Sequence, residues 1–329
     1  MARRLLAGER LALARIISWA ENGDPRFAQA LAAIYGRVGR AWRIGVTGPP
    51  GAGKSSLVNA LIEPLRERGN TVGVLAIDPS SPFTGGALLG DRIRMEERTT
   101  DSGVYIRSMA TRASHGGLAR AAVDACDAMD AFGFDVLLIE TVGVGQTEYE
   151  IAAASDTVIV VLCPGAGDGI QAMKAGLLEV ADVLAVNKSD LPGADQMVLD
   201  LEDAQRLRSR PRFGPESNAP RWEVPVVPVS AHTAAGLPGL LQAIDGHRRS
   251  TEERDLATVR AAKRVRQVRR VVGERLDEYL WGAGGQAERA QALLGKSRTP
   301  YDVAEEILGS LWDSNSGSNF GRKDPYGKA

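Results

Sequence analysis

The residues best suited to chemistry form one short stretch, Gly48-Pro49-Pro50-Gly51-Ala52-Gly53-Lys54-Ser55. An apolar run, residues 43–47, precedes it, and residues 54–68 have the periodicity of a helix. Glycine lets the chain turn tightly, so that backbone N–H groups and the positive end of the following helix can surround a phosphate. In a loop with this spacing, the lysine contacts the β- and γ-phosphates and the serine hydroxyl binds Mg²⁺. We therefore predict a P-loop whose nucleotide contacts are Gly51, Ala52, Gly53, Lys54, Ser55 and Ser56.

A second stretch, Asn187-Lys188-Ser189-Asp190, follows the apolar run 183–186. A carboxylate placed like that of Asp190 can accept two hydrogen bonds from the ring N–H and the exocyclic amine of guanine. Adenine offers no such pair of donors and would leave the charge unpaired. We expect Asn187 to read the other edge of the base and the Lys188 stem to lie along the ring. The bound nucleotides are therefore predicted to be GTP and GDP.

The dipeptide Ser230-Ala231 stands at the end of the last predicted strand. It matches a pair of residues that holds the guanine oxygen through a backbone N–H. Two acidic residues, Asp78 and Glu140, also end predicted strands. Mg²⁺ prefers hard oxygen ligands and keeps several waters, so one hydroxyl and one or two carboxylates are sufficient to hold it. Many P-loop proteins have Asp where this chain has Glu140, and the extra methylene would let that carboxylate reach the metal through a water. Each acid alone could be a helix cap or a solvated strand end, but the set predicts a magnesium site.

The composition is that of an ordinary globular protein, with 329 residues, 44% hydrophobic and 25% charged. A formal net charge of -1 gives no indication of nucleic acid or an anionic membrane as a partner. No apolar run reaches the roughly eighteen residues that span a bilayer. The only two cysteines, Cys126 and Cys163, lie in apolar surroundings, as expected in a reducing cytoplasm. The three histidines are scattered, which gives a Cys/His metal centre little support.

Apolar runs alternate with amphipathic segments from residue 43 onward. Continuous Val/Ile/Leu runs are typical of strands buried on both faces, so we predict an α/β fold with a mostly parallel sheet flanked by helices. Ligands bind beyond the carboxyl ends of the strands in such sheets. The predicted strands are 43–47, 71–78, 104–107, 134–141, 157–164, 183–188 and 224–230. The predicted helices are 54–68, 118–132, 148–154, 169–180, 196–210 and 237–247.

Residues 1–42 read as an N-terminal arm of two short helices, broken at 22–25, where Asp24 can cap and Pro25 can open the second helix. The arginines of the first twenty residues are also typical of a transit peptide. Leu6, Leu13 and Ile17 share a helical face, however, which favours a structural helix that packs on the sheet.

The chain after Arg249 changes in composition. Residues 253–280 form a charged helical pattern with an apolar stripe of Val265, Val268, Val272, Leu276 and Leu280. The basic residues beside the stripe are typical of a solvated helix face, which we favour over nucleic-acid binding. The stripe needs a surface to cover it, which suggests a second subunit. Helices are also predicted at 286–294 and 299–312. We predict four parts: an arm (1–42), a GTPase domain (43–249), a C-terminal helical region (250–313) and a disordered tail (314–329).

Six motifs together resemble the MeaB/ArgK-type GTPases, which are P-loop proteins of the SIMIBI class. That family chaperones adenosylcobalamin-dependent acyl-CoA mutases such as methylmalonyl-CoA mutase. The resemblance extends to about Trp312 and implies a homodimer formed by the C-terminal helices. The motifs are the P-loop at 48–55, Asp78-Pro79-Ser80-Ser81, Leu89-Gly90-Asp91-Arg92, Glu140-Thr141-Val142-Gly143-Val144-Gly145-Gln146, Pro164-Gly165-Ala166-Gly167-Asp168 and Asn187-Lys188-Ser189-Asp190.

The resemblance implies roles for particular residues. Asp91 would join Asp78, Glu140 and Ser55 around the metal, and Lys54, Glu140 and Lys174 would be the catalytic residues. Segment 165–174 resembles a switch through which the mutase senses the nucleotide, with Asp168, Gln171 and Lys174 as the residues that move.

The chain differs from other GTPases at the residue that orients the attacking water. Other GTPases orient the attacking water with a Gln directly after an Asp-x-x-Gly run, whereas here Val144 follows Gly143 and Gln146 comes two residues later. No arginine finger is identified, since Arg92, Arg94, Arg107 and Arg112 all lie in candidate switch loops. We therefore expect slow intrinsic hydrolysis that a partner stimulates.

Two other functions share a nucleotide site of this kind. A metal-insertion GTPase would need Cys or His ligands beside the site, and a small-molecule kinase would have no need for the guanine-reading Asp190. The residues do not choose among methylmalonyl-, isobutyryl-, 2-hydroxyisobutyryl- and ethylmalonyl-CoA mutases as the partner.

Overall fold

The computed structural model describes residues 1–79, 101–111, 117–141, 147–165, 177–209, 222–283, 285–294 and 298–313. Two compact units make up the chain, Met1–Leu256 and Ala257–Ala329. The first contains the N-terminal helices and the whole sheet. The predicted division into arm, GTPase domain, helical region and tail stays a prediction.

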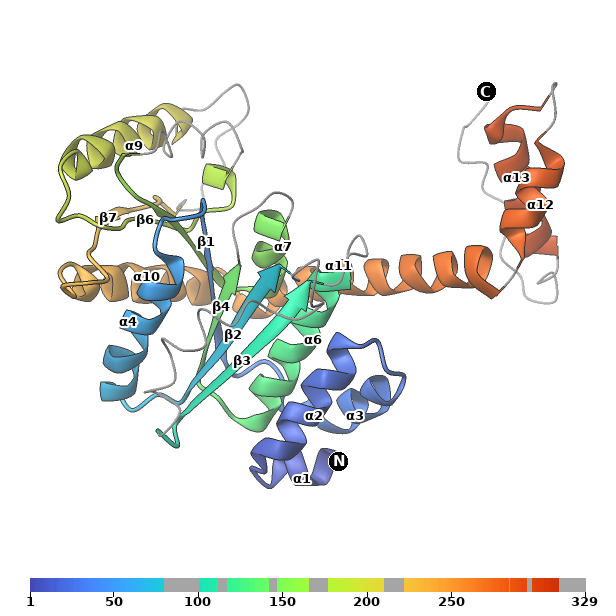
Figure 1. The fold of residues 1–329 in the computed structure, drawn as a ribbon, viewed down its shortest axis with the longest axis horizontal. Coiled ribbons are helices and arrows are strands. Elements are labelled where there is room, and N and C mark those ends of the chain that lie inside the picture. The colour runs from blue at the N-terminus through green and yellow to red at the C-terminus, as the bar shows by residue number, and fades with distance from the viewer. Residues whose placement is uncertain are drawn as a thin grey trace. The chain divides into compact units, whose positions relative to one another are not determined.

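A sheet of seven strands forms the centre of the first unit, in the order β3-β2-β4-β1-β5-β6-β7 (Figure 1). Every neighbouring pair is parallel, so the carboxyl ends of all strands lie at one edge. The predicted parallel α/β sheet is confirmed. The strands are β1 (Trp42–Thr47), β2 (Val72–Pro79), β3 (Val104–Thr111), β4 (Val136–Thr141), β5 (Thr157–Leu162), β6 (Val183–Val186) and β7 (Val226–Pro228).

Two strands differ in length from the prediction. β3 runs to Thr111, four residues beyond the predicted end, and pairs with β2 along its whole length. β7 covers three residues rather than seven. It lies at the edge of the sheet, and Pro225 and Pro228 lack the N–H that a longer ladder would need.

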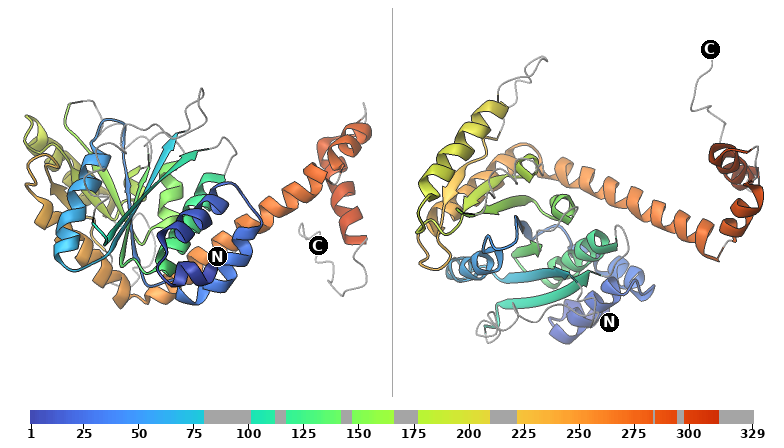
Figure 2. Two further views of the ribbon diagram at one scale, coloured as in Figure 1. Left: turned by 60° about the horizontal axis from the view of Figure 1, so that its bottom comes forward. Right: turned by 45° about the horizontal axis from the view of Figure 1, so that its top comes forward.

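Helices cover both faces of the sheet (Figure 2). One face packs against α4 (Lys54–Glu67) and α10 (Leu237–Glu253) through an apolar cluster that includes Leu61 and Ile244. The other face packs against α6 (Gly117–Phe132), α7 (Thr147–Ala154) and α9 (Ala194–Ser209). Of the predicted helix 169–180, the described part is a short 3-10 helix, η3 (Leu177–Glu179), and residues 166–176 lie outside the described residues.

The N-terminal arm has three α-helices rather than the predicted two: α1 (Ala2–Leu6), α2 (Arg10–Glu21) and α3 (Arg26–Ile34), followed by the 3-10 helix η1 (Tyr35–Arg37). The unpredicted break is at Gly8, whose φ of 84° lies in the left-handed region and ends the first helix. The break at 22–25 is confirmed, since the Asp24 carboxylate accepts the Arg26 N–H at 2.9 Å. Leu5, Leu13 and Ile16 are fully buried in the cluster that includes α6, so the arm is a structural layer, although it packs mainly on α6 and not directly on the sheet as expected.

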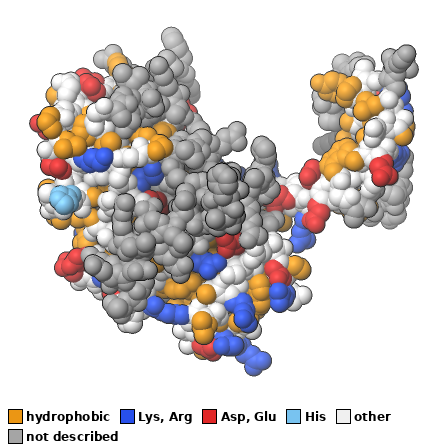
Figure 3. All heavy atoms as spheres, in the orientation of Figure 1, with side chains coloured by type: hydrophobic (Ala, Val, Ile, Leu, Met, Phe, Trp, Pro, Cys, Tyr) orange, Lys and Arg blue, Asp and Glu red, His pale blue; other side chains and the backbone are white. Residues whose placement is uncertain are grey.

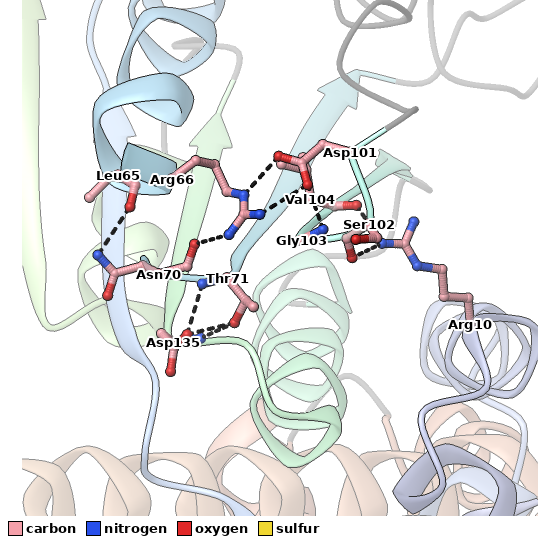
Figure 4. Close-up of polar contacts among 10 residues, drawn as sticks. All are labelled: Arg10, Leu65, Arg66, Asn70, Thr71, Asp101, Ser102, Gly103, Val104 and Asp135. Carbon is pink, nitrogen blue, oxygen red and sulfur yellow. Dashed lines mark hydrogen bonds and ion pairs between the residues drawn. The ribbon is translucent and has the colours of Figure 1, made fainter. Parts of the chain in front are cut away.

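A polar junction joins the arm to the turn that leads into β3 (Figure 4). Arg66 of α4 makes two parallel hydrogen bonds to the Asp101 carboxylate, at 2.8 and 3.0 Å. Arg10 of α2 donates to the carbonyl oxygens of Ser102 and Val104, at 2.6 and 2.9 Å. The amino end of β3 is therefore held by the P-loop helix and by the arm.

The elements described in the second unit are helices. They are α11 (Leu256–Asp277), which begins at the last residue of the first unit, the π-helix η4 (Glu278–Ala283), α12 (Gln286–Leu293) and α13 (Pro300–Asp313). Arg298 donates to the Glu306 carboxylate, and Val303 and Ile307 of α13 are buried. Figure 3 shows hydrophobic side chains on the surface of this unit. Among the described residues, no helix has the length and apolar character needed to cross a membrane.

Candidate functional site

The P-loop connects the end of β1, at Thr47, to the start of α4, at Lys54. Three of its glycines have left-handed φ values: 141° at Gly48, 81° at Gly51 and 86° at Gly53. A Cβ on Gly48 would lie 2.0 Å from the Val161 carbonyl oxygen of β5, and one on Gly53 would lie 2.3 Å from Nδ2 of Asn187. Only glycine fits at these two positions, because the loop backbone is pressed against its neighbours.

Lys54 and Ser55 begin α4 at this loop. The Lys54 ammonium is buried and donates to the carbonyl oxygens of Gly48 and Pro49, at 2.9 and 3.0 Å. The Ser55 hydroxyl donates to the carboxylate of Glu140, the penultimate residue of β4. Ser56 follows on the exposed side of the helix. The loop thus brings a cation, a hydroxyl and a carboxylate to one end of α4.

The Ser55–Glu140 pair fits a magnesium ion. Both groups are hard oxygen donors, and they already lie within hydrogen-bond distance of one another at the carboxyl edge of the sheet. Asp78 belongs to β2, where Ala76 pairs with Glu140, so the Asp78 backbone lies one pleat further along the same edge. Its side chain and the whole of Asp91 lie outside what the structure describes. Of the four predicted metal ligands, the structure brings two together.

Asn187 joins the two halves of the predicted nucleotide site. Its Nδ2 donates to the Ala52 carbonyl oxygen at 2.8 Å, and its Oδ1 accepts the Ala231 N–H at 3.0 Å. Lys188, with a left-handed φ of 58°, donates from Nζ to the Gly51 carbonyl oxygen at 2.8 Å. The structure places the Asn187 amide between two loops, and its role in reading the base stays a prediction. These ties between the loops were missed, because strand-end position alone does not show which loops lie side by side.

Asp190 is exposed at the same edge of the sheet. A hydrogen bond from the buried Ser230 side chain, followed by one from its own backbone N–H, holds the pKa of Asp190 below its ordinary value. The carboxylate is therefore ionised at neutral pH, which is the state that accepts two hydrogen bonds from guanine. Ser230 was predicted as a nucleotide contact, and in the structure its side chain orients Asp190.

Several predicted functional residues lie outside the described residues: Gln146, Asp168, Gln171, Lys174, Arg92, Arg94 and Arg112. Arg107 is described, and its placement in a switch loop was wrong. It lies within β3, and its guanidinium donates to Glu21 at 2.8 Å and to Ser18 at 3.1 Å, both in α2. The Arg107 side chain is half-buried, and the arm holds it by an ion pair with Glu21.

Comparison with known proteins identifies the family. The family model described as "Methylmalonyl Co-A mutase-associated GTPase MeaB" matches residues 13–284. The chain belongs to the MeaB family. As a member of this GTPase family, it hydrolyses GTP to GDP and phosphate.

Relatives of the chain agree with this assignment. A protein from Pyrococcus abyssi is 42% identical over 313 residues, which are 94% of this chain and 95% of that protein. GTPase ArgK from Escherichia coli is 42% identical over 192 residues, which are 57% of this chain and 58% of ArgK. Among solved structures, that of an LAO/AO transport system kinase matches with a TM-score of 0.70 and 27% identity, over 94% of this chain and 96% of the other. The similarity to MeaB/ArgK-type GTPases and the P-loop fold are therefore confirmed.

Proposed function

We propose that this MeaB-family GTPase is Mg²⁺-dependent and binds GTP and GDP at the carboxyl edge of the sheet, between the P-loop and the loop after β6. The observation that carries the proposal is the contact of the Ser55 hydroxyl with the Glu140 carboxylate at the start of α4. The amino end of a helix attracts phosphate, and a hydroxyl beside a carboxylate offers Mg²⁺ two oxygen ligands there.

Each residue has a proposed role. Gly51, Ala52, Gly53 and Ser56 contact the phosphates, and Lys54 stabilises charge on the γ-phosphate as water attacks it in line. The phosphates would offer Lys54 charged acceptors in place of the loop carbonyls that it now contacts. Ser55, Asp78, Asp91 and Glu140 would hold the metal, which neutralises charge on the phosphates when bound. Asn187, Lys188, Asp190, Ser230 and Ala231 form the base site, and Lys174 is a further catalytic residue.

The description of the family names methylmalonyl-CoA mutase as the associated enzyme. We propose that the chain is a cytoplasmic chaperone that gates cofactor loading and protects an adenosylcobalamin-dependent acyl-CoA mutase. Candidate partners are the methylmalonyl-, isobutyryl-, 2-hydroxyisobutyryl- and ethylmalonyl-CoA mutases. Neither nucleic acid nor membrane is proposed as a partner.

A homodimer is part of the proposal. Val265, Val268, Val272 and Leu276 follow one another along α11 at three- and four-residue steps, and each side chain is 50–60% exposed. Such a stripe is typical of a helix that packs against another helix. A second copy of α11 is the partner that the resemblance implies.

The test is GTP turnover by the purified protein with and without each candidate mutase from the same organism. Lys54→Ala is the blank, because it removes the cation from the phosphate site. Stimulation by one mutase identifies the partner. Measurable turnover that no mutase alters would contradict the chaperone role and leave the GTPase assignment intact.

The nucleotide is tested separately. Asp190→Asn should shift preference from GTP toward XTP, because an amide pairs with the 2-oxo group of xanthine where the carboxylate pairs with the amine of guanine. Unchanged use of ATP by wild type and variant would instead support a small-molecule kinase. Among the described residues, no cluster of three His, Cys, Asp or Glu side chains favours a metal-insertion GTPase.

A further inference from the structure

Two threonines meet at the point where β1 and β4 end. Thr47 is the last residue of β1 and Thr141 the last of β4. The Thr141 hydroxyl donates to Oγ1 of Thr47 at 3.0 Å. Thr141 is 2% exposed and Thr47 is 0% exposed. A buried hydroxyl that loses its partner costs free energy, so this bond is a defined tie between two strand ends.

The tie is adjacent to the proposed chemistry on both strands. Thr47 directly precedes the first glycine of the P-loop, and Thr141 directly follows Glu140. Val46 pairs with Glu140 in the ladder, so the hydroxyl bond continues the strand pairing by one residue.

The contacts of Glu140 and Thr141 lie on opposite faces of the sheet. Successive residues of a strand point to opposite faces, so Glu140 and Thr141 do not share a face. Glu140 meets Ser55 on the face covered by α4, where Leu138 is also buried. Thr141 meets Thr47 on the face covered by α6 and α7, where Ile139 is buried. The Glu140 side chain starts from the β4 backbone, so the position of that backbone sets where its carboxylate lies relative to Ser55.

We propose that Thr47 and Thr141 are positioning residues for the magnesium site, because their bond fixes the end of β4 at the distance from the P-loop that Glu140 requires. This inference rests on the proposed function. Neither threonine contacts nucleotide or metal. Both act through the placement of Glu140 beside Ser55.

If the Thr47–Thr141 bond only stabilised the fold, removing another buried threonine hydroxyl of this sheet would have the same effect on the Mg²⁺ requirement. Thr157, the first residue of β5, provides the matched control. It is equally buried, and its Oγ1 accepts from the Trp42 indole N–H at 3.0 Å and lies 2.9 Å from Nδ1 of His247. Thr157 starts its strand, so it lies at the opposite end of the sheet from the nucleotide site.

The experiment follows the binding of a fluorescent GDP analogue as Mg²⁺ is added, and the measured quantity is the Mg²⁺ concentration that gives half of the full effect. Binding of the same analogue in EDTA and the thermal unfolding temperature are measured alongside. Thr141→Val keeps the shape and removes the hydroxyl, and we expect it to raise that concentration about five- to tenfold, the size of one hydrogen bond. Binding in EDTA should change less than about twofold, and Thr141→Ser should restore the wild-type value. Thr157→Val should lower the unfolding temperature without changing the Mg²⁺ requirement.

Thr47→Val removes the same bond from the other strand and serves if Thr141→Val fails to fold. The double variant should need no more Mg²⁺ than either single variant, because all three variants lack the same hydrogen bond. Equal Mg²⁺ shifts for Thr141→Val and Thr157→Val would overturn the inference, as would an unchanged Mg²⁺ requirement in Thr141→Val. A wild-type protein whose GDP binding does not respond to Mg²⁺ would overturn the proposed Mg²⁺ dependence itself, which is a distinct outcome.

Discussion

Arg43 offers the sharpest test of how β1 is held in place. Its guanidinium is buried and donates to the Asp127 carboxylate at 2.7 Å and to the Asp130 carboxylate at 2.9 Å, both on α6. Asp130 also accepts the backbone N–H groups of residues 39–41, at 2.8 to 3.1 Å. The nearby carboxylates raise the pKa of Arg43 above its ordinary value despite burial. One buried cation therefore forms ion pairs with two buried carboxylates.

Arg43→Met keeps most of the side-chain volume and removes the charge. Breaking a buried ion pair typically costs 3–5 kcal/mol, because the partner left behind is uncompensated. Here two carboxylates would be left, of which Asp130 keeps its three backbone donors. We expect a loss of about 4 kcal/mol in the free energy of unfolding. Asp127→Asn should cost less, about 1–2 kcal/mol, because Arg43 retains one carboxylate.

Urea unfolding followed by circular dichroism measures these differences. The control is Arg68→Met, which breaks the pair with Asp245, whose two side chains are 40% and 45% exposed. An exposed pair of this kind contributes at most about 1 kcal/mol. If Arg43→Met and Arg68→Met destabilised the protein equally, the argument that burial makes the Arg43 cluster costly to break would be refuted.

Three further predictions follow from single contacts. Gly53→Ala should weaken GDP binding at least tenfold, measured by fluorescence titration, because its Cβ would lie 2.3 Å from Nδ2 of Asn187 and because φ is left-handed; wild-type affinity would contradict the tight packing of the loop. Burial raises the pKa of Cys126 to about 12, so iodoacetamide at pH 8 should label it only after unfolding, as mass spectrometry would detect; rapid labelling of the folded protein would contradict its burial. Hydrogen bonds from Arg26 lower the pKa of Asp24 to about 2, so any stabilisation from this pair is present above the unfolded pKa of about 3.8 and is lost as pH falls through about 2. NMR titration should show a low Asp24 midpoint that rises in Arg26→Ala, and an unchanged midpoint would refute this cause.

The sheet and the P-loop were predictable because local patterns determine them. Buried parallel strands appear in the sequence as apolar runs, and glycine spacing marks the loop. The succession of strands and helices along the chain therefore followed from the sequence. The break at Gly8 was not predicted, since a single glycine in a helical pattern is compatible with a continuous helix. The length of α10, which continues six residues past the predicted end, was likewise missed because its last turns are polar and carry no periodic signal.

Contacts between distant segments explain the remaining errors. Arg107 was assigned to a switch loop from its position in the chain, but its partner Glu21 is 86 residues away and belongs to the arm. Neither Thr47 nor Thr141 was predicted to have a role of its own, because threonine is common in strands. Their one sequence signal is position: Thr47 directly precedes the P-loop, and Thr141 lies in the motif of residues 140–146. Two such positions on neighbouring strands could have been paired once the strand order was known.

The cross-ties change how substitutions in the site should be interpreted. The amide of Asn187 joins Ala52 of the P-loop to Ala231 of the base site, and Lys188 contacts Gly51. A residue that holds two loops together affects both, since removing it leaves the buried carbonyl of Ala52 and the half-buried N–H of Ala231 without that partner. Asn187→Ala should therefore weaken phosphate binding as well as selection of guanine, whereas Asp190→Asn, on an exposed side chain, should alter selection alone. Comparing inorganic pyrophosphate competition between the two variants separates a residue that positions loops from one that reads the base.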